Sequence, residues 1–207
     1  MIDIHTHILP GVDDGSPDLE TSLMMAEAAA RSGVAVIAAT CHSNQEEYHN
    51  YESEELRQRF AELQEALERE RIPVRIVRGM EIWAVGRLEE KIRSGRLISL
   101  NGSRFFLTEV PFDAEPEEIR ARLTEILDLG KVPVLAHPER YYCVQDRPNW
   151  LFEWRMLGVL AQMNKGSIFG RFGPKTEKTA GILLDHQMVT CIAVSYTHLT
   201  LPTKLEV

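Results

Sequence analysis

Short apolar runs alternate with longer amphipathic stretches along most of this sequence. The run at residues 34–39 is apolar throughout, as expected for a strand that is buried on both faces. Similar runs of strand length occupy residues 1–4, 74–77, 105–109, 132–136 and 189–193. Between them, helical spacing places apolar residues on one face, as in the stripe formed by Leu56, Phe60, Leu63 and Leu67. This alternation predicts a parallel β/α architecture of the α/β class.

Helix boundaries are also marked in the sequence. Ser16-Pro17-Asp18 reads as a helix start, with a capping hydroxyl, proline at the first helical position and an acid in the first turn. Gly33 should end that helix. Gly130 should end a second amphipathic helix, whose apolar face is Ile119, Leu123, Ile126 and Leu127.

Histidines and carboxylates recur where the predicted strands end. His5 and His7 are two residues apart, so a strand would direct both imidazoles to one side, and Pro10, Gly11 and Gly15 allow Asp13 or Asp14 to fold back towards them. The others are His42, Glu81, Glu109 and His137. Because the carboxyl ends of parallel strands share one edge, these side chains should meet there. Convergence from five strand ends favours a distorted or incomplete barrel over an open sheet.

Taken singly, each of these residues has an ordinary explanation as a core or surface polar group. Together they would bury several charges without compensation, which a cation cluster would supply. Imidazole and carboxylate ligands without thiolate suit Mn, Zn or Fe, and two or three such ions would activate water for the hydrolysis of a phosphate ester. Arg140, three residues after His137, is placed to hold the phosphate with two hydrogen bonds, although a lone arginine is about as often a structural partner.

Four other features are weaker candidates. His49 is expected to be exposed, His186 to lie at a helix end, and Cys41 to be a small buried thiol. The glycine-rich stretch 165–173 lacks the order of a P-loop and is expected to be a loop at the rim of the site.

Composition narrows the choice of function. The 207 residues are sufficient for one domain with one core, and the net charge of -8 disfavours nucleic acid and anionic membranes as partners. Three scattered cysteines suggest free thiols in a reducing cytoplasm. The sequence predicts neither an export signal nor a membrane-spanning segment. The sequence does not decide whether the chain forms a homo-oligomer.

Several motifs resemble the PHP (polymerase and histidinol phosphatase) superfamily, and more closely its capsular-polysaccharide-type protein-tyrosine phosphatases. The match runs over residues 1 to about 193. The motifs that carry it are residues 3–15 (DIHTHILPGVDDG), 39–42 (ATCH), 79–82 (GMEI), 109–111 (EVP), 136–141 (AHPERY) and 166–173 (GSIFGRFG).

This resemblance implies a distorted β/α barrel with three metal ions, often Mn. It also implies hydrolysis of phosphotyrosine on the tyrosine-rich tail of an autophosphorylating bacterial tyrosine kinase that controls exopolysaccharide export. Arg140 would bind phosphate, and Asp13 is the alternative to Asp14 as a ligand. The implied metal ligands are His5, His7, Asp14, His42, Glu81, Glu109 and His137. Cys41-His42-Ser43 departs from the family's proline followed by two histidines.

The sequence after residue 193 departs further from the family. Relatives continue with Ser-Asp-Ala-His, whereas this chain reads VSYTHLT from residue 194 and contains no aspartate there. His198 falls one place beyond the family's histidine, and such a slip turns a side chain to the other face. We therefore expect residues 1–193 to form the phosphatase domain and residues 194–207 to be a sequencing artefact such as a translated adapter. Such a tail should impair activity and stability.

Three alternative functions remain at this point. One is a small-molecule phosphatase of the histidinol-phosphate type, and another is a catalytically impaired module that binds metal or docks on the kinase. A polymerase proofreading domain is disfavoured by the negative net charge.

Overall fold

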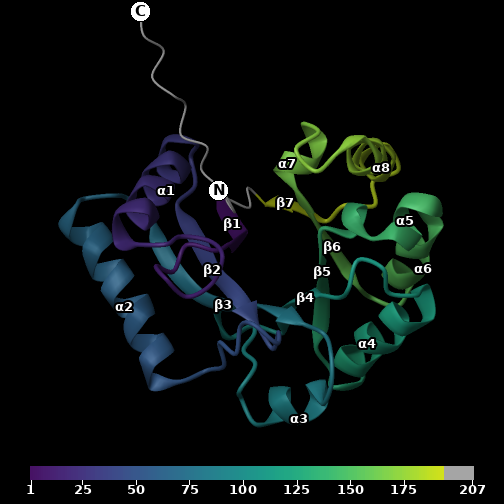
Figure 1. Ribbon diagram of the computed structural model, residues 1–207, viewed down its shortest axis with the longest axis horizontal. Coiled ribbons are helices and arrows are strands. Elements are labelled where there is room, and N and C mark those ends of the chain that lie inside the picture. Colours follow the sequence, from purple (N-terminus) through teal and green to yellow (C-terminus); the bar gives the residue numbers. More distant parts are fainter. Residues whose placement is uncertain (194–207) are drawn as a thin grey trace, which may run out of the picture.

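Seven parallel strands form one sheet in the computed structural model, which describes residues 1–193 (Figure 1). Their order in space is their order in the sequence. The strands are β1 (Ile2–Thr6), β2 (Val36–Ser43), β3 (Arg75–Trp83), β4 (Phe105–Glu109), β5 (Val132–Ala136), β6 (Leu160–Asn164) and β7 (Cys191–Ala193). Residues 194–207, the tail that we expect to be a sequencing artefact, lie outside the described residues. His198 belongs to this tail.

The sheet curls until its two edge strands, β1 and β7, approach each other, and the helices cover its outer face (Figure 1). The helices are α1 (Leu19–Arg31), α2 (Glu54–Arg69), α3 (Leu88–Arg93), α4 (Pro116–Asp128), α5 (Tyr142–Asp146), α6 (Asn149–Met156), α7 (Lys165–Ile168) and α8 (Pro174–Asp185), with single 3₁₀ turns η1 (Leu100–Gly102) and η2 (Pro138–Arg140). This nearly closed β/α barrel confirms the predicted fold class. No helix among residues 1–193 is long and apolar enough to cross a membrane.

The core lies between the outer face of the sheet and the helices. Leu63, Leu123 and Leu183, from α2, α4 and α8, are each 0 % exposed, as the amphipathic stripes require. The strands contribute apolar side chains to both faces, which is typical of a parallel sheet under helices.

Strand register brings two of the predicted site residues side by side. His42 pairs with Glu81 across β2 and β3, and Trp83 pairs with Glu109 across β3 and β4. Because all the strands are parallel, their carboxyl ends lie at the same end of the barrel.

The ladder between β1 and β2 is irregular between Asp3 and Thr6. Buried Asp3 holds this irregularity, because its carboxylate accepts from the amide of His5 (3.2 Å) and the hydroxyl of Thr6 (3.0 Å). The Thr6 amide in turn donates to the Thr40 hydroxyl (3.0 Å). Local side-chain bonds therefore set the position of the strand that presents the first two histidines.

Three features of the structure differ from what the sequence predicted. The predicted cap of the first helix was wrong by two residues, because Asp18 accepts from the Thr21 amide (2.8 Å) while the Ser16 hydroxyl donates to the Asp18 carbonyl (2.8 Å). The sequence pattern did not predict β6 or the short helices α3, α5, α6 and α7. The final strand is shorter than predicted, beginning at Cys191.

Candidate metal centre

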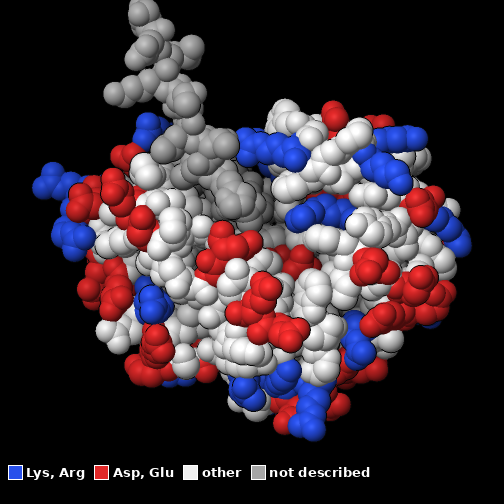
Figure 2. Space-filling view, viewed as in Figure 1, with Lys and Arg blue, Asp and Glu red and all other residues white. Residues whose placement is uncertain are grey.

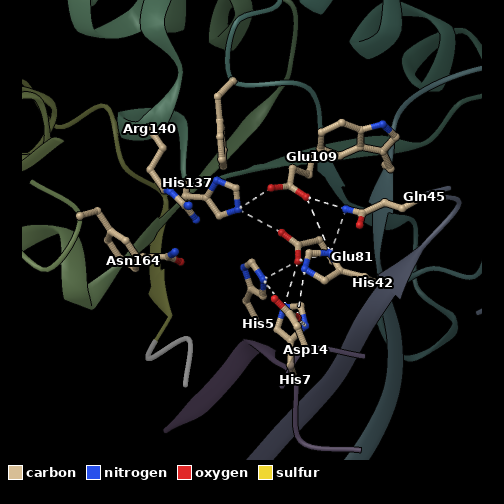
Figure 3. A pocket seen from close by; sticks show the side chains of 13 residues that line it. His5, His7, Asp14, His42, Gln45, Glu81, Glu109, His137, Arg140 and Asn164 are labelled. Atoms are coloured by element: carbon tan, nitrogen blue, oxygen red, sulfur yellow. Dashed lines mark hydrogen bonds and ion pairs between the residues drawn. The ribbon is translucent and has the colours of Figure 1, made fainter. Parts of the chain in front are cut away.

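All seven predicted metal ligands and Arg140 line one cavity of about 400 Å³ at the carboxyl end of the barrel, the central cavity (Figure 3). The strands and the loops that follow them supply these side chains, as the sequence predicted. The lining residues are His5, His7, Asp14, His42, Gln45, Glu81, Trp83, Glu109, Phe112, His137, Arg140, Asn164 and Phe172.

Glu81 lies at the middle of this arrangement and is 1 % exposed. Its Oε2 lies 3.1 Å from Nε2 of His5, 3.0 Å from Nε2 of His7 and 3.2 Å from Nδ1 of His42. Its Oε1 lies 3.0 Å from Nε2 of His137. Four imidazoles from β1 and its loop, β2 and the end of β5 thus converge on one carboxylate (Figure 3).

The tautomers of His5 and His7 follow from their outer contacts. Nδ1 of His5 lies 2.7 Å from Oε1 of Gln162, whose amide nitrogen donates to Asn164, so this Nδ1 must be the donor. Nδ1 of His7 likewise donates to the Asp13 carboxylate at 2.7 Å. Metal-bound histidines characteristically donate their second nitrogen in this way.

In the neutral imidazoles, both Nε2 atoms therefore present lone pairs, 3.2 Å from each other and about as far from the Glu81 oxygen. Three electron-rich atoms at these distances repel one another unless a cation lies between them. His5, His7 and Glu81 form one of three groups whose ligand atoms lie within 4.8 Å of one another. The other two groups are His7, Asp14 and His42, and His42, Glu81 and Glu109. This donor set fits divalent ions.

The structure distinguishes the two candidate aspartates. Asp13 faces inward beneath the ring of His7, and its carboxylate also accepts from the amides of His42 (2.8 Å) and Gly15 (3.0 Å). The Asp14 side chain is 46 % exposed and lines the cavity, with Oδ1 3.5 Å from Nε2 of His42. Asp13 therefore orients a histidine, while Asp14 is free to reach an ion.

The directions of the pKa shifts indicate a negative field in the cavity. Burial opposes charge on His7, but Asp13 and Glu81 outweigh it and raise the pKa of His7 well above its ordinary value. Glu81 is also buried, yet the surrounding imidazoles, His5 first, hold the pKa of Glu81 well below its ordinary value. Burial and then the Glu81 charge raise the pKa of Glu109. A proton or a metal ion satisfies this negative field.

Burial favours the neutral form of both His137 and His42. Burial lowers the pKa of His137 to about 4 and also lowers the pKa of His42. The Nδ1 atom of His137 is buried and has no hydrogen-bond partner among the described residues. His137 also has a left-handed backbone (φ 35°), a strained conformation that is concentrated at functional sites.

Arg140 follows His137 by three residues and lies between two aromatic rings. Its guanidinium carbon is 4.4 Å from the Phe112 ring centroid and 4.6 Å from that of Phe172. These cation–π contacts hold the planar group at the cavity wall, where it can meet an anion. Buried Glu139 fixes the same turn, accepting from the Asn164 amide (3.0 Å) and the Ser167 hydroxyl (2.6 Å).

The weaker candidates behave as predicted. His49 is exposed, His186 ends α8, and Cys41 is a buried thiol whose pKa burial raises. The stretch 165–173 does reach the rim through Phe172, although its first residues form α7.

Sequence reasoning missed Gln45, Trp83, Phe112 and Asn164 in the cavity wall. Gln45 links two of the predicted ligands, since its amide nitrogen lies 3.1 Å from Nδ1 of His42 and 3.2 Å from the Glu109 carboxylate. Trp83 and Asn164 each end a strand, β3 and β6, and this position could have identified them.

Comparison with known proteins gives a family match over residues 1–200, to the capsular polysaccharide synthesis family CpsB/CapC. The tyrosine-protein phosphatase YwqE of Bacillus subtilis is 35 % identical over 193 residues, covering 93 % of this chain and 76 % of YwqE. The tyrosine-protein phosphatase CpsB of Streptococcus pneumoniae is 30 % identical over 198 residues, covering 93 % of this chain and 81 % of CpsB.

Solved structures agree with this match. One from a crystallographic study of YwqE from Bacillus subtilis and CpsB from Streptococcus pneumoniae superposes with a TM-score of 0.89 at 33 % identity, covering 97 % of this chain and 81 % of that one. That study describes them as unique metal-dependent tyrosine phosphatases.

Gly15→Ala should disturb the turn that carries both aspartates. A methyl group at Gly15 would overlap the carbonyl oxygen and Cβ of His7, so we expect a loss of about 2 kcal/mol or more in the free energy of unfolding, together with weaker binding of divalent metal ions. Urea denaturation and calorimetric titration would measure these effects.

The matched control is Gly181→Ala in α8, where the added methyl meets nothing within 4 Å. It should stabilise the protein by about 0.5–1 kcal/mol, because alanine favours a helix over glycine. Equal effects of the two substitutions would contradict the proposed crowding at Gly15.

Glu139→Gln should change how stability depends on pH. Burial raises the pKa of Glu139 from 4.5 to about 7. The folded state thus favours the neutral acid. The stability that this group contributes is complete below its unfolded pKa of 4.5 and is lost as pH rises through its folded pKa of about 7. The variant should therefore gain about 3 kcal/mol relative to the parent between pH 4.5 and 8. Parallel curves of unfolding free energy against pH would contradict this.

Proposed function

Because this chain belongs to the CpsB/CapC family of capsular polysaccharide synthesis, we propose that it is a metal-dependent protein-tyrosine phosphatase. The observation that supports this most strongly is the convergence of four imidazoles on Glu81 beside the clamped Arg140. A cation cluster polarises phosphoryl oxygens and a guanidinium binds them with two hydrogen bonds, so the two together suit a phosphate ester.

The proposed metal ligands are those of the three groups described above together with His137. His5, His7 and Glu81 would hold one ion, and Glu81 is placed to share a second with His42 and Glu109. Asp14 would complete a third site with His7 and His42. Mixed imidazole and carboxylate ligands favour Mn²⁺, with Zn²⁺ or Fe as alternatives. When bound, such ions polarise the phosphoryl oxygens and lower the pKa of water.

The chain's own residues bind and orient the substrate. Arg140 donates two parallel hydrogen bonds to the phosphate, and the rings that enclose its guanidinium keep it from turning away. Trp83, Phe112 and Phe172 line the cavity and offer apolar contacts to the phenyl ring of phosphotyrosine. Gln162 and Asp13 keep the histidine tautomers fixed.

The proposal also covers the substrate, the location in the cell and the bounds of the domain. The substrate is the phosphotyrosine tail of a bacterial tyrosine kinase that regulates capsule or exopolysaccharide synthesis. The location is the cytoplasm, consistent with the three free cysteines at 41, 143 and 191. We also propose that residues 1–193 form the phosphatase domain and that the tail after them is foreign to it, although the family match runs to residue 200.

Phosphate release from a phosphotyrosine peptide tests this function. We expect release with Mn²⁺ and none after chelation, and Glu81→Gln should lower kcat/KM at least 100-fold because it removes the charge that the four imidazoles share. Mn²⁺ should also raise the melting temperature of the parent and not that of the variant. The exposed Glu117→Gln in α4 is the matched control.

The assay should be run on this chain and on one whose residues 194–207 are replaced by a terminus of the family type, so that a foreign tail cannot hide the chemistry. Mn²⁺ binding without phosphate release in either chain would contradict the proposal. Selective hydrolysis of histidinol phosphate would instead favour the small-molecule alternative.

Arg140→Lys should lower kcat/KM about 10- to 100-fold, because lysine keeps the charge but loses the planar fork and its stacking. The inhibition constant of inorganic phosphate should rise in parallel, which separates phosphate binding from chemistry. Arg147→Lys is the control, since Arg147 also stacks on a ring, that of Trp150 (4.4 Å), yet does not line the cavity. Equal losses in the two variants would contradict a phosphate contact by Arg140.

A further inference from the structure

A second cavity of about 340 Å³ adjoins the central cavity, and we call it the flanking groove. Its principal lining residues are Phe112, Arg140, Tyr142, Gln145, Phe172 and Lys175. Phe112, Arg140 and Phe172 also line the central cavity, so the stacked guanidinium forms the ridge between the two. A molecule whose phosphate lies at Arg140 can therefore extend into the flanking groove without a break.

The flanking groove is held in place by bonds between three loops. The Gln145 amide donates to the Glu139 carbonyl (3.1 Å) and to the Thr176 hydroxyl (3.2 Å), which ties the turn after β5 to the start of α8. The Tyr142 amide donates to the Phe112 carbonyl (2.9 Å), which ties the loop after β4 to α5. A preformed groove of this kind binds a partner without a large cost of ordering.

Its lining is aromatic and cationic. Tyr142 is 58 % exposed, so its ring is available to a ligand in the groove. Lys175, in the first turn of α8, is exposed at the edge of the groove. Figure 2 shows positive side chains over α7 and α8 on one side of the central hollow.

The opposite rim is acidic. Figure 2 shows negative side chains on the other side of the hollow. Exposed Glu46 and Glu47 lie in the loop after β2, next to Tyr48, whose ring stacks on His42 (centroids 5.6 Å apart). Asp14 is exposed within the cavity itself. A substrate that carries further negative charge is repelled on this side and attracted over Lys175.

We propose that the flanking groove binds the peptide segment next to the phosphotyrosine, and that Lys175 selects an acidic side chain in that segment. This proposal rests on the proposed phosphatase function and specifies its substrate class. A small phosphate ester would fill the central cavity alone. A peptide would also pack against Tyr142 and Phe172 and place its carboxylate near the ammonium of Lys175.

Binding of two matched peptides tests this selection. Each carries phosphonomethyl-phenylalanine, a phosphotyrosine mimic that cannot be hydrolysed, flanked on both sides by either glutamate or glutamine. Fluorescence anisotropy in the presence of Mn²⁺ should give a dissociation constant about three- to tenfold lower for the glutamate peptide. The preference should shrink in 0.5 M salt, because added ions screen exposed charges.

Two variants of α8 localise the effect. Lys175→Glu should abolish or reverse the preference for the glutamate peptide. Lys178→Glu makes the same charge change on the same helix, but Lys178 does not line the groove, so this variant should keep most of the preference. Equal dissociation constants for the two peptides in the parent, or equal changes in the two variants, would overturn the proposal.

Release of phosphate from the corresponding phosphotyrosine peptides reports on the proposed function separately. Selective binding without release would contradict the phosphatase activity and still support the groove. Release without a glutamate preference would support the activity and overturn the groove.

Discussion

The end of the barrel that carries the central cavity depends on one electrostatic constraint, the negative charge of Glu81 buried among four imidazoles. Glu81 is 1 % exposed, and its two oxygens contact His5, His7, His42 and His137 within 3.2 Å. Glu109 adds a second carboxyl group to the same cluster. Such a cluster needs a proton or a metal ion inside it, because an uncompensated buried charge costs several kcal/mol. The metal dependence reported for the homologous phosphatases agrees with this cluster of imidazoles and carboxylates.

The positions of these ligands depend on further polar side chains that lie behind them and do not themselves line the ion sites. Gln162 and Asp13 fix the two histidine tautomers, Asp3 shapes the strand before them, and Glu139 anchors the turn that carries His137. Each is a buried polar residue, so each lowers stability unless its bonds are satisfied. The apolar layer between sheet and helices offsets this cost. The apolar packing on the outer face of the barrel therefore provides the stability that the polar groups at the cavity end lower.

The sequence predicts the strands and helices that have a regular apolar pattern. It does not predict the conformations of the loops. Strand ends are recognisable from the apolar runs that precede them, so the convergence of His5, His42, Glu109 and the other ligands on one edge was predictable from the sequence. β6 was missed because Gln162 and Asn164 interrupt its apolar run, and both point polar groups towards the cavity end of the barrel. The separate tasks of Asp13 and Asp14, and the place of Gln45, depend on loop conformation. Loop positions follow from tertiary contacts, which no local pattern encodes.

A chain with a net charge of -8 must still attract a phosphorylated substrate. Its mean field repels anions, but exposed charges more than about 10 Å apart are largely screened at physiological salt. The local distribution of charge therefore decides the approach. Arg140 is fixed between Phe112 and Phe172, on the side where α7 and α8 carry their cations, while the acids lie across the hollow (Figure 2). This asymmetry favours one direction of entry, so that the surface around the cavity, and not only the ions within it, selects which phosphate esters reach Arg140.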